Sequence, residues 1–379
     1  MLHTQVLHPS DLSDSDAGQW SDMQAATPAF ATPLVGPQFA RAVGEVRGDA
    51  RVAIFRRGRR TVGYLAHHRR PTGFARPIGA PFSDYHALVT APGETLDAGE
   101  ALRGAGLGAF RFSGLIDPAG LFDDSVRERT TGFRIVLNTR PEDYLDALAA
   151  GSRNRGQNFR RYSAKLRREL GDPRIVASHD QTTFDALLDW KREQIRRTGV
   201  QDFLGTDWAQ ALLQRLFDTR EGNFQGFTIS LFAGSTHLCS HFGVRLDDHF
   251  HPWIGASNPD FRLHSLGLVH QWMAIEAMPS LGLTTYDLGP GFAHWKSLFA
   301  EGGVSVGAGL ATTPTLGGRV AGTVDDLWAL PAVSAIPAVG RLRRRMDQIA
   351  LTRLTLGGRI QSLMEAFGAY DRRVATRRS

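Results

Sequence analysis

The chain has 379 residues and one cysteine, which excludes an intrachain disulfide and favours a reducing compartment. Its formal net charge of +6 is uneven: residues 341–379 hold ten arginines against three acidic residues, whereas residues 1–340 carry 34 basic and 35 acidic residues. A near-neutral body argues against a dedicated nucleic-acid binder, so no DNA partner is expected. The sequence shows neither a signal-peptide pattern nor an uncharged apolar run of about 18 residues, so we expect a cytoplasmic protein of two or three domains.

Residues 1–139 predict a first domain of mixed helices and strands. Residues 1–27 read as a polar lead-in with a short helix around Asp11–Ala25, and from Pro28 the pattern becomes strand-like. Two short strand-type runs flank a turn at residues 57–59 and predict a hairpin. The elements expected here are the hairpin strands Arg51–Phe55 and Thr61–Ala66, a Gly- and Pro-rich segment over 71–98, a helix over Asp97–Leu107, and strands over Ala109–Ser113 and Gly132–Leu137.

Residues 140–172 predict two linking helices. Pro141 and Glu142 open the first, which runs through Leu148. The second, Asn154–Leu170, has apolar residues at helical spacing and a strongly basic polar face. That face has two interpretations, a solvated surface or a groove for an anionic ligand, and charge alone favours the solvated surface.

Residues 173–312 predict a second domain with a clear order of elements. A mostly antiparallel sheet with helices on both faces follows from that order, and a crossover helix makes one parallel pair. The predicted elements are the strands Arg174–Ala177, Phe227–Phe232, His237–Arg245, His249–Ser257, Thr284–Leu288 and Gly303–Leu310, and the helices Gln181–Arg197, Trp208–Asp218, Gly267–Met278 and Ala293–Phe299.

The segment between the strand ending at Ser257 and the helix beginning at Gly267 reads Arg262-Leu263-His264-Ser265-Leu266-Gly267. A helix N-terminus offers unpaired N–H groups and a positive dipole to a phosphate. Gly267 would let the backbone approach the phosphate closely, and Arg262 could pair with it. Ser265 has a second interpretation, as the N-cap of the helix.

This order of elements resembles the Gcn5-related N-acetyltransferase (GNAT) fold, and the six-residue segment resembles its cofactor loop, with Ser265 in place of the first glycine. Further motifs look like the CelD-type, FemAB-related GNAT family of bacterial exopolysaccharide and holdfast loci. They are Arg155-Gly156-Gln157-Asn158-Phe159-Arg160-Arg161, Trp190-Lys191-Arg192-Glu193-Gln194, His241-Phe242-Gly243-Val244-Arg245, Tyr286-Asp287-Leu288-Gly289, Trp295-Lys296 and Gly79–Tyr85.

The resemblance spans roughly residues 8–310 and implies an α/β (α+β) fold of two tandem GNAT-like domains. The first would be degenerate, and the second would bind acetyl-CoA or another acyl-CoA between its fourth and fifth strands, at Ile254, Gly255 and residues 262–267. The implied reaction is N-acylation of an amino sugar in a surface polysaccharide or a lipid-linked precursor. The alternatives are a lipid or sphingoid-base acyltransferase, a transferase that uses aminoacyl-tRNA, and a non-catalytic ligand sensor.

Direct attack of an amine on a thioester needs a proton acceptor and a donor for the oxyanion. Asp287, at a strand end beside the expected gap, is either that base or a cap for the Gly289–Gly291 loop. His241 is the second candidate base, although a histidine among apolar neighbours is more often a core residue. Lys296 would hold a phosphate or a substrate carboxylate, or else lie on the surface. The family's tyrosine before this lysine is replaced by Trp295, which removes a candidate acid.

Four residues are candidates for acceptor binding: Asp84, Tyr85, Arg155 and Trp190. No metal site is expected, because His249 and His251 share one strand face without a third ligand at a persuasive spacing. Cys239 is expected to be a small buried hydrophobe.

The remaining residues, 313–379, predict a linker and a basic tail. Residues 311–340, rich in Ala, Gly, Thr and Pro, look like a linker plus a weak helix, and amphipathic helices are expected over Arg341–Ala350 and Arg359–Ala369. Three interpretations stay open: a peripheral contact with the inner face of the membrane, docking on a partner, and binding of a cyclic-di-GMP-like nucleotide by Arg341, Arg344 and Arg345. The spacing Arg341-x-x-x-Arg345 is similar to the arginine pair of some such receptors. The oligomeric state is not indicated.

Overall fold

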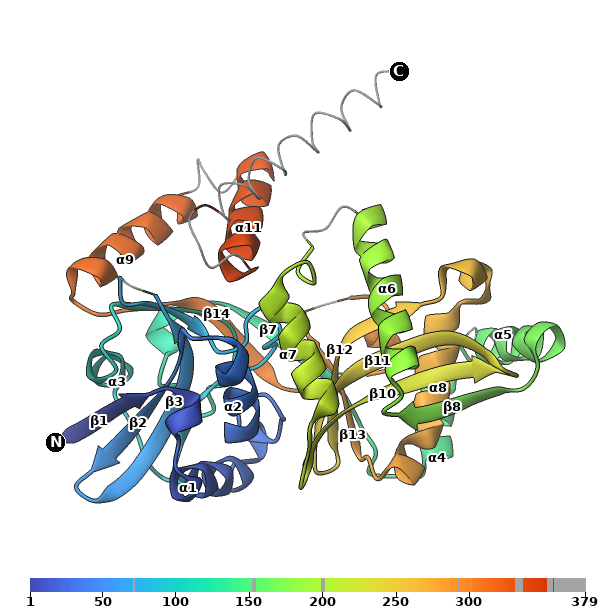
Figure 1. Cartoon of the computed structure of the whole chain (residues 1–379), viewed down its shortest axis with the longest axis horizontal. Helices are drawn as coiled ribbons and strands as arrows, with labels where there is room; N and C mark the ends of the chain where they lie inside the picture. Colours follow the sequence, from blue (N-terminus) through green and yellow to red (C-terminus); the bar gives the residue numbers. More distant parts are fainter. Residues whose placement is uncertain are drawn as a thin grey trace.

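The computed structural model describes residues 1–70, 72–151, 155–198, 202–291, 293–300, 302–330, 337–352 and 357. Only the backbone is described at Arg155, residues 262–264, 337–338, Arg341 and Arg344. Two halves lie side by side along the longest axis of the molecule (Figure 1). The helix predicted over Arg359–Ala369 lies outside the described residues.

The N-terminal half is a curved sheet with helices against it. Its elements are β1 (Leu2–Leu7), α1 (Asp14–Ala25), α2 (Pro37–Val46), β2 (Ala50–Arg57), β3 (Arg60–Arg69), β4 (Phe74–Pro77), β5 (Leu88–Thr90), α3 (Ala98–Gly104), β6 (Ala109–Leu115) and β7 (Val126–Val136).

The C-terminal half contains α4 (Pro141–Ala150), α5 (Arg155–Leu170), β8 (Pro173–Ser178), α6 (Gln181–Thr198), α7 (Asp207–Asp218), β9 (Arg220–Glu221), β10 (Phe224–Ala233), β11 (Thr236–Leu246), β12 (His249–Ser257), α8 (Leu266–Ala277) and β13 (Thr285–Pro290). The chain then returns to the N-terminal half as β14 (Ser305–Thr312), α9 (Leu316–Ala329) and α11 (Pro337–Thr352).

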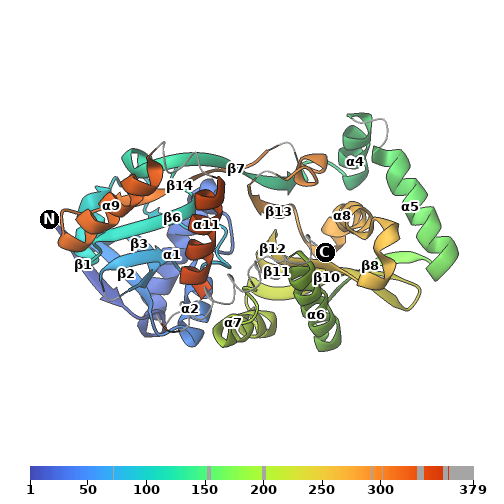
Figure 2. The ribbon, with the colours of Figure 1, turned by 90° about the horizontal axis from the view of Figure 1, so that it is seen from above.

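One continuous sheet joins the two halves. Across the described residues, the strand order is β1-β2-β3-β4-β6-β14-β7-β13-β12-β11-β10-β8. β7 is the connecting strand, because it pairs antiparallel with β14 on one side and with β13 on the other, and Figure 2 shows it running from one half into the other. The prediction of a mixed α/β fold with a mostly antiparallel sheet is confirmed.

Two N-terminal predictions were wrong. The lead-in contains the strand β1, which pairs with Val52–Arg57 of β2. The strand-like interpretation from Pro28 also fails, because Pro37–Val46 is the helix α2. Pro37 at the first turn pre-sets a helical φ, and the helix buries an apolar stripe that includes Phe39, Ala40 and Val43.

The helices α9 and α11, which follow β14, pack on each other and on the N-terminal half. Arg343 of α11 pairs with Asp325 of α9, and Asp347 of α11 pairs with Arg76 of β4. The helix α9 falls in the segment 311–340, where a linker plus a weak helix was expected, and both helices lie over the N-terminal half (Figure 1). None of the helices in the described part of the chain has the length and hydropathy that crossing a bilayer requires.

Candidate functional site

The central feature of the site is a gap between β12 and β13. These parallel strands pair only at His249↔Thr285 and Phe250↔Tyr286 among the residues that the structure describes. Beyond Phe250, β12 stays paired with β11 through Ser257, whereas β13 pairs with β7. The two strands separate where the resemblance predicts the fourth and fifth strands to do so.

A cavity of about 870 Å³ lies at this gap, within the range typical of small-molecule sites, roughly 300–1,000 Å³. The strands β11 and β12 form its floor. Its walls come from α6, the N-terminus of α8, and the segment after β13. The lining residues used below are Asp84, Trp190, Lys191, Cys239, His241, Gly255, Leu266, Gly267, Trp295 and Lys296.

The N-terminus of α8 opens onto the cavity. Ser265 occupies its N-cap position with left-handed backbone angles (φ 49°, ψ 45°) and makes no side-chain cap bond. That conformation is one that glycine adopts easily, so Ser265 holds here the backbone shape of the glycine it replaces in the family pattern. A Cβ added at Gly267 would meet no atom within 4 Å, so a side chain there would project into open space. The first N–H groups of a helix lack intrahelical acceptors and favour an anion.

Four candidate residues named from the sequence meet at this cavity: Asp84, Trp190, His241 and Lys296. Lys296 donates from Nζ to the carbonyl oxygens of Gly289 (3.1 Å) and Pro290 (2.9 Å). Burial lowers its pKa, against the raising influence of Asp84 and Asp287. Lys296 is thus tied to the end of β13 rather than extended into solvent.

Asp287 lies inside β13, not at the strand end, and is fully buried. Its Oδ1 accepts hydrogen bonds from the Tyr85 hydroxyl (2.8 Å) and the Gly289 N–H (2.9 Å). Its Oδ2 accepts from Arg134 Nε (2.7 Å) and lies 3.2 Å from His249 Nε2. Burial alone would raise the pKa of Asp287, but the bonds and charges of His249 and His251 outweigh it and hold the pKa well below 3.8.

Tyr85 belongs to the same network and does not line the cavity. Its side chain is fully buried, and burial together with the Asp287 charge raises its pKa far above 10. Because Tyr85 and Arg134 come from the N-terminal half, the Asp287 carboxylate joins the two halves through hydrogen bonds. The network includes the hydrogen bond expected if Asp287 caps the Gly289–Gly291 loop, because the Gly289 N–H donates to its carboxylate.

His251 connects this buried network to the cavity. Its Nε2 lies 3.1 Å from Asp84 Oδ2, and its Nδ1 lies 3.7 Å from Asp287 Oδ1. Burial disfavours the imidazolium, but hydrogen bonds and charges from Asp287 and Asp84 overcome this and raise the pKa of His251 to about 9. Asp84, with 38% of its side chain exposed, is the member of this chain of contacts that reaches the cavity.

His241 lines the cavity from β11 and hydrogen-bonds through Nδ1 to the Tyr286 hydroxyl (2.7 Å). Burial, His270 and Lys191 together lower its pKa well below 6.5, so its ring is neutral at pH 7. Trp190 stands on α6 with its ring 4.5 Å from the His237 ring. Beside it, Lys191 Nζ donates to the Gly255 carbonyl (3.2 Å), and burial lowers the Lys191 pKa.

Several predicted residues lie outside the described side chains: Arg155, Arg262, Leu263, His264, Arg341 and Arg344. Leu266 and Gly267 line the cavity with Gly255, whereas Ile254 is buried in the core. The roles of Arg134, Lys191, His251 and His270 were not predicted. The signal available in the sequence was Arg134 itself, a basic residue among apolar neighbours inside the predicted strand Gly132–Leu137.

The family of the acetyltransferase (GNAT) domain matches residues 152–297, the segment that carries β12, α8 and β13. The chain is an acyltransferase with a GNAT domain. No curated protein matches the sequence.

Among solved structures, FemX is similar with a TM-score of 0.51 and 11% identity, covering 81% of this chain and 96% of that one. The C-terminal domain of a putative lysylphosphatidylglycerol synthetase from Agrobacterium fabrum has a TM-score of 0.48 and 11% identity, covering 83% and 96%. A tandem GNAT protein from the clavulanic acid biosynthesis pathway has a TM-score of 0.47 and 12% identity, covering 83% and 100%. At 11% identity the likeness to FemX shows a shared fold.

Proposed function

We propose that the protein is an acyl-CoA-dependent N-acyltransferase that transfers an acetyl group to an amine. The observation that carries the proposal is the meeting of two features at one cavity: the separation of β12 from β13 after Phe250, and the open N-terminus of α8 at Gly267. The gap fits an extended chain between strands, and the helix N-terminus fits its pyrophosphate. Neither feature alone would select this substrate.

The reaction needs the thioester held beside an amine. The amine nitrogen attacks the thioester carbonyl carbon, the C–S bond breaks, and the CoA thiolate leaves. We assign proton removal from the amine to Asp84, since its carboxylate faces the cavity and His251 fixes its orientation at 3.1 Å. Asp287 is a positioning residue that acts through His251, because it is fully buried and does not line the cavity.

His241 is the other candidate base. Its Nδ1 is engaged with the Tyr286 hydroxyl, and burial lowers its pKa well below 6.5. A neutral imidazole with so low a pKa is a weak proton acceptor near pH 7. Because His241 Nδ1 is already engaged and Asp84 presents a carboxylate that is 38% exposed at the cavity, Asp84 is the better assignment on geometry.

For the acceptor we propose an amino sugar of a surface polysaccharide or its precursor. An ammonium group would be attracted by Asp84, and the exposed Trp295 at the cavity edge offers an apolar face on which a sugar ring can pack. The resemblance to CelD-type acyltransferases supports this acceptor class. Lipid amines remain the nearest competing class because they present the same nucleophile.

The test is release of the CoA thiol, followed with a thiol reagent while the acceptor amine is varied. Acetyl-CoA and longer acyl-CoAs are compared with glucosamine, sphinganine and buffer alone. We expect amine-dependent thiol release, fastest with acetyl-CoA and the amino sugar, and its loss in Gly267→Trp. Release that is independent of any amine, or that survives Gly267→Trp unchanged, would contradict the proposal.

A second candidate is transfer from aminoacyl-tRNA, as the FemAB resemblance implies. The observation that favours it is α5, where Arg160, Arg161 and Lys165 lie on one basic helix. Two neighbours are already paired, Arg167 with Asp172 and Arg168 with Glu169. This candidate predicts tRNA binding that weakens steeply with salt, and a gel-shift titration without such binding removes it.

A further inference from the structure

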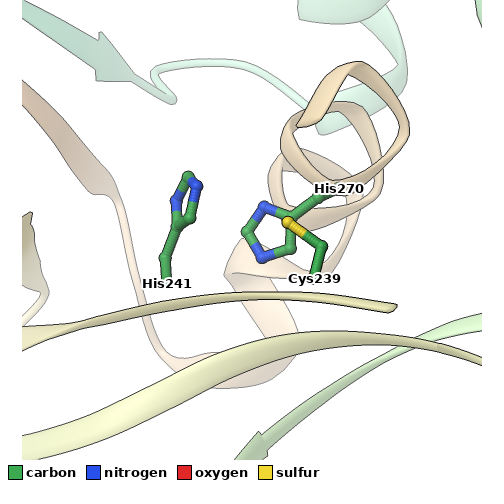
Figure 3. A group of neighbouring side chains, drawn as sticks. All are labelled: Cys239, His241 and His270. Carbon is green, nitrogen blue, oxygen red and sulfur yellow. The ribbon is translucent and has the colours of Figure 1, made fainter. Parts of the chain in front are cut away.

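A group of three side chains at the base of the cavity has no role in the reaction described above. Cys239 and His241 stand on β11, two residues apart and therefore on the same face of the strand. His270 projects toward them from α8, as Figure 3 shows. One ligand atom of each residue lies within 4.8 Å of the other two, and the two imidazole centroids are 4.2 Å apart.

His270 carries a buried nitrogen without a hydrogen-bond partner. The residue is 0% exposed, and its Nε2 lies 2.9 Å from the Ile229 carbonyl oxygen. A carbonyl only accepts, so Nε2 carries the hydrogen and Nδ1 is left with its lone pair. Nδ1 has no partner among the described residues. A buried polar atom that lacks a partner is costly, so it calls for a physical explanation.

The other two residues are also arranged to offer a lone pair. His241 is held through Nδ1 by the Tyr286 hydroxyl, the same kind of second contact that orients metal-binding histidines in proteins. Cys239 is the only cysteine of the chain, and its sulfur accepts a hydrogen bond from Ser257 at 3.4 Å. Imidazole nitrogen and cysteine sulfur are both ligand types that Zn²⁺ takes in proteins.

We propose that Cys239, His241 and His270 form a site for one Zn²⁺ ion, with a fourth coordination position that opens into the cavity. The opening follows from the lining of the cavity, which includes Cys239 and His241. A site with three protein ligands and one open position differs from the closed four-ligand sites that only support a fold.

Metal binding would change both the protonation and the spacing of the three ligand atoms. Binding of Zn²⁺ replaces the thiol proton, which passes to solvent, and the thiolate offsets part of the metal charge near Lys191. Tetrahedral Zn–S and Zn–N bonds of about 2.3 and 2.0 Å require the three atoms, which lie within 4.8 Å of one another, to draw together by up to roughly 1.5 Å.

The test uses Co²⁺ as a spectroscopic substitute for Zn²⁺ on the full chain. We expect one equivalent of Co²⁺ to give a thiolate-to-cobalt charge-transfer band in the near ultraviolet, and Zn²⁺ to displace it. Because the chain has one cysteine, this band must vanish in Cys239→Ser. His270→Gln should weaken binding at least about tenfold, and Zn²⁺ should raise the unfolding midpoint of the wild type but not of Cys239→Ser.

His3→Gln is the matched control, since His3 is an exposed histidine on β1, and it should bind Co²⁺ like the wild type. A wild-type protein without the charge-transfer band would overturn the proposal. So would equal affinity of the wild type and His270→Gln. Both variants are checked for a native circular-dichroism spectrum, and Zn²⁺ stoichiometry by mass spectrometry of the folded protein supplies a second readout.

Discussion

Two buried polar clusters on neighbouring strands of the second half differ in how they are satisfied. Around Asp287, both carboxylate oxygens accept hydrogen bonds, from Tyr85, Arg134, His249 and Gly289. Around His270, a fully buried nitrogen has no partner among the described residues. Arg134 Nη2 and His251 Nδ1, beside Asp287, also lack a hydrogen-bond partner among the described residues, but both side chains pair in charge with its carboxylate. The clusters therefore differ in what lies beside the unpaired nitrogen: a carboxylate in one, and the ligand atoms of Cys239 and His241 in the other.

The difference teaches how to separate a structural group from a ligand-binding one. Asp287 looked like a catalytic base from its place in the sequence, yet its partners come from both halves and leave no oxygen facing the cavity. Cys239 was expected to be a core residue and His241 a core residue or a base, yet they lie together with His270, whose Nδ1 has no partner among the described residues. A buried carboxylate whose oxygens are all paired holds the fold, whereas an unpaired imidazole nitrogen beside two further ligand atoms can bind a cation.

The largest expected effect is on the fold itself. Asp287→Ala should lower the free energy of unfolding by about 3–5 kcal/mol, because it leaves Arg134 buried without its carboxylate. Urea denaturation measures this loss. Asp287→Asn, which keeps an acceptor for Tyr85, should lose less. A change below about 1 kcal/mol in the alanine variant would break the distinction between the clusters.

The next effect separates chemistry from stability. Asp84→Asn should lower kcat/KM at least about 100-fold, since the cavity loses its proton acceptor. Its unfolding free energy should fall by less than that of Asp287→Ala, because the Asp84 side chain is 38% exposed and Asp287 remains beside His251. Asp189→Asn, 76% exposed on α6, is the matched control and should retain full activity. Equal rates for Asp84→Asn and wild type would remove Asp84 from the mechanism.

The charge on His251 predicts a pH dependence of stability. Its pKa is about 6.5 when unfolded and is raised to about 9 in the folded chain by Asp287 and Asp84. A raised pKa contributes stability that is complete below pH 6.5 and is lost as the pH rises through 9. Urea midpoints between pH 6 and pH 9.5 should therefore fall for the wild type. The fall should be shallower in His251→Gln, and parallel curves would contradict the assigned charge.

The smallest effect concerns a cluster with several partners. Asp325 is 1% exposed and pairs with Arg111, Arg127 and Arg343. Arg343→Ala should cost only about 0.5–1 kcal/mol, because two cations remain. Thermal unfolding measures it, and a loss above about 3 kcal/mol would show that α11 depends on this one contact.

The order of elements in the second half was predictable because its periodicities are strong and its turns are short. The helix α2 and the strand β1 were missed for different reasons. The helix α2 is only ten residues long. The strand β1 lies at the edge of the sheet, and exposed residues alternate with half-buried ones along its first part. Local patterns in such segments are weak compared with the tertiary contacts that select them.

The residues of the cavity were predictable only in part, because some of its contacts join residues that lie far apart in the sequence. Trp190, His241 and Lys296 belong to motifs within one domain and line one cavity, and their roles stay predictions. The Arg134–Asp287 pair joins residues 153 positions apart, and His270 lies in a mostly apolar helix. No local pattern reports such contacts, because only the folded sheet brings β7 and α8 next to β13 and β11.

The measurement that tests the account most directly is a calorimetric titration of the full chain with acetyl-CoA. The account predicts one binding event per chain in the wild type and in Gly267→Ala. In Gly267→Trp, whose side chain would enter the cavity, it predicts affinity weaker by at least about 100-fold, or 2.7 kcal/mol. No binding of acetyl-CoA to the wild type, or undiminished binding to a folded Gly267→Trp, would contradict it.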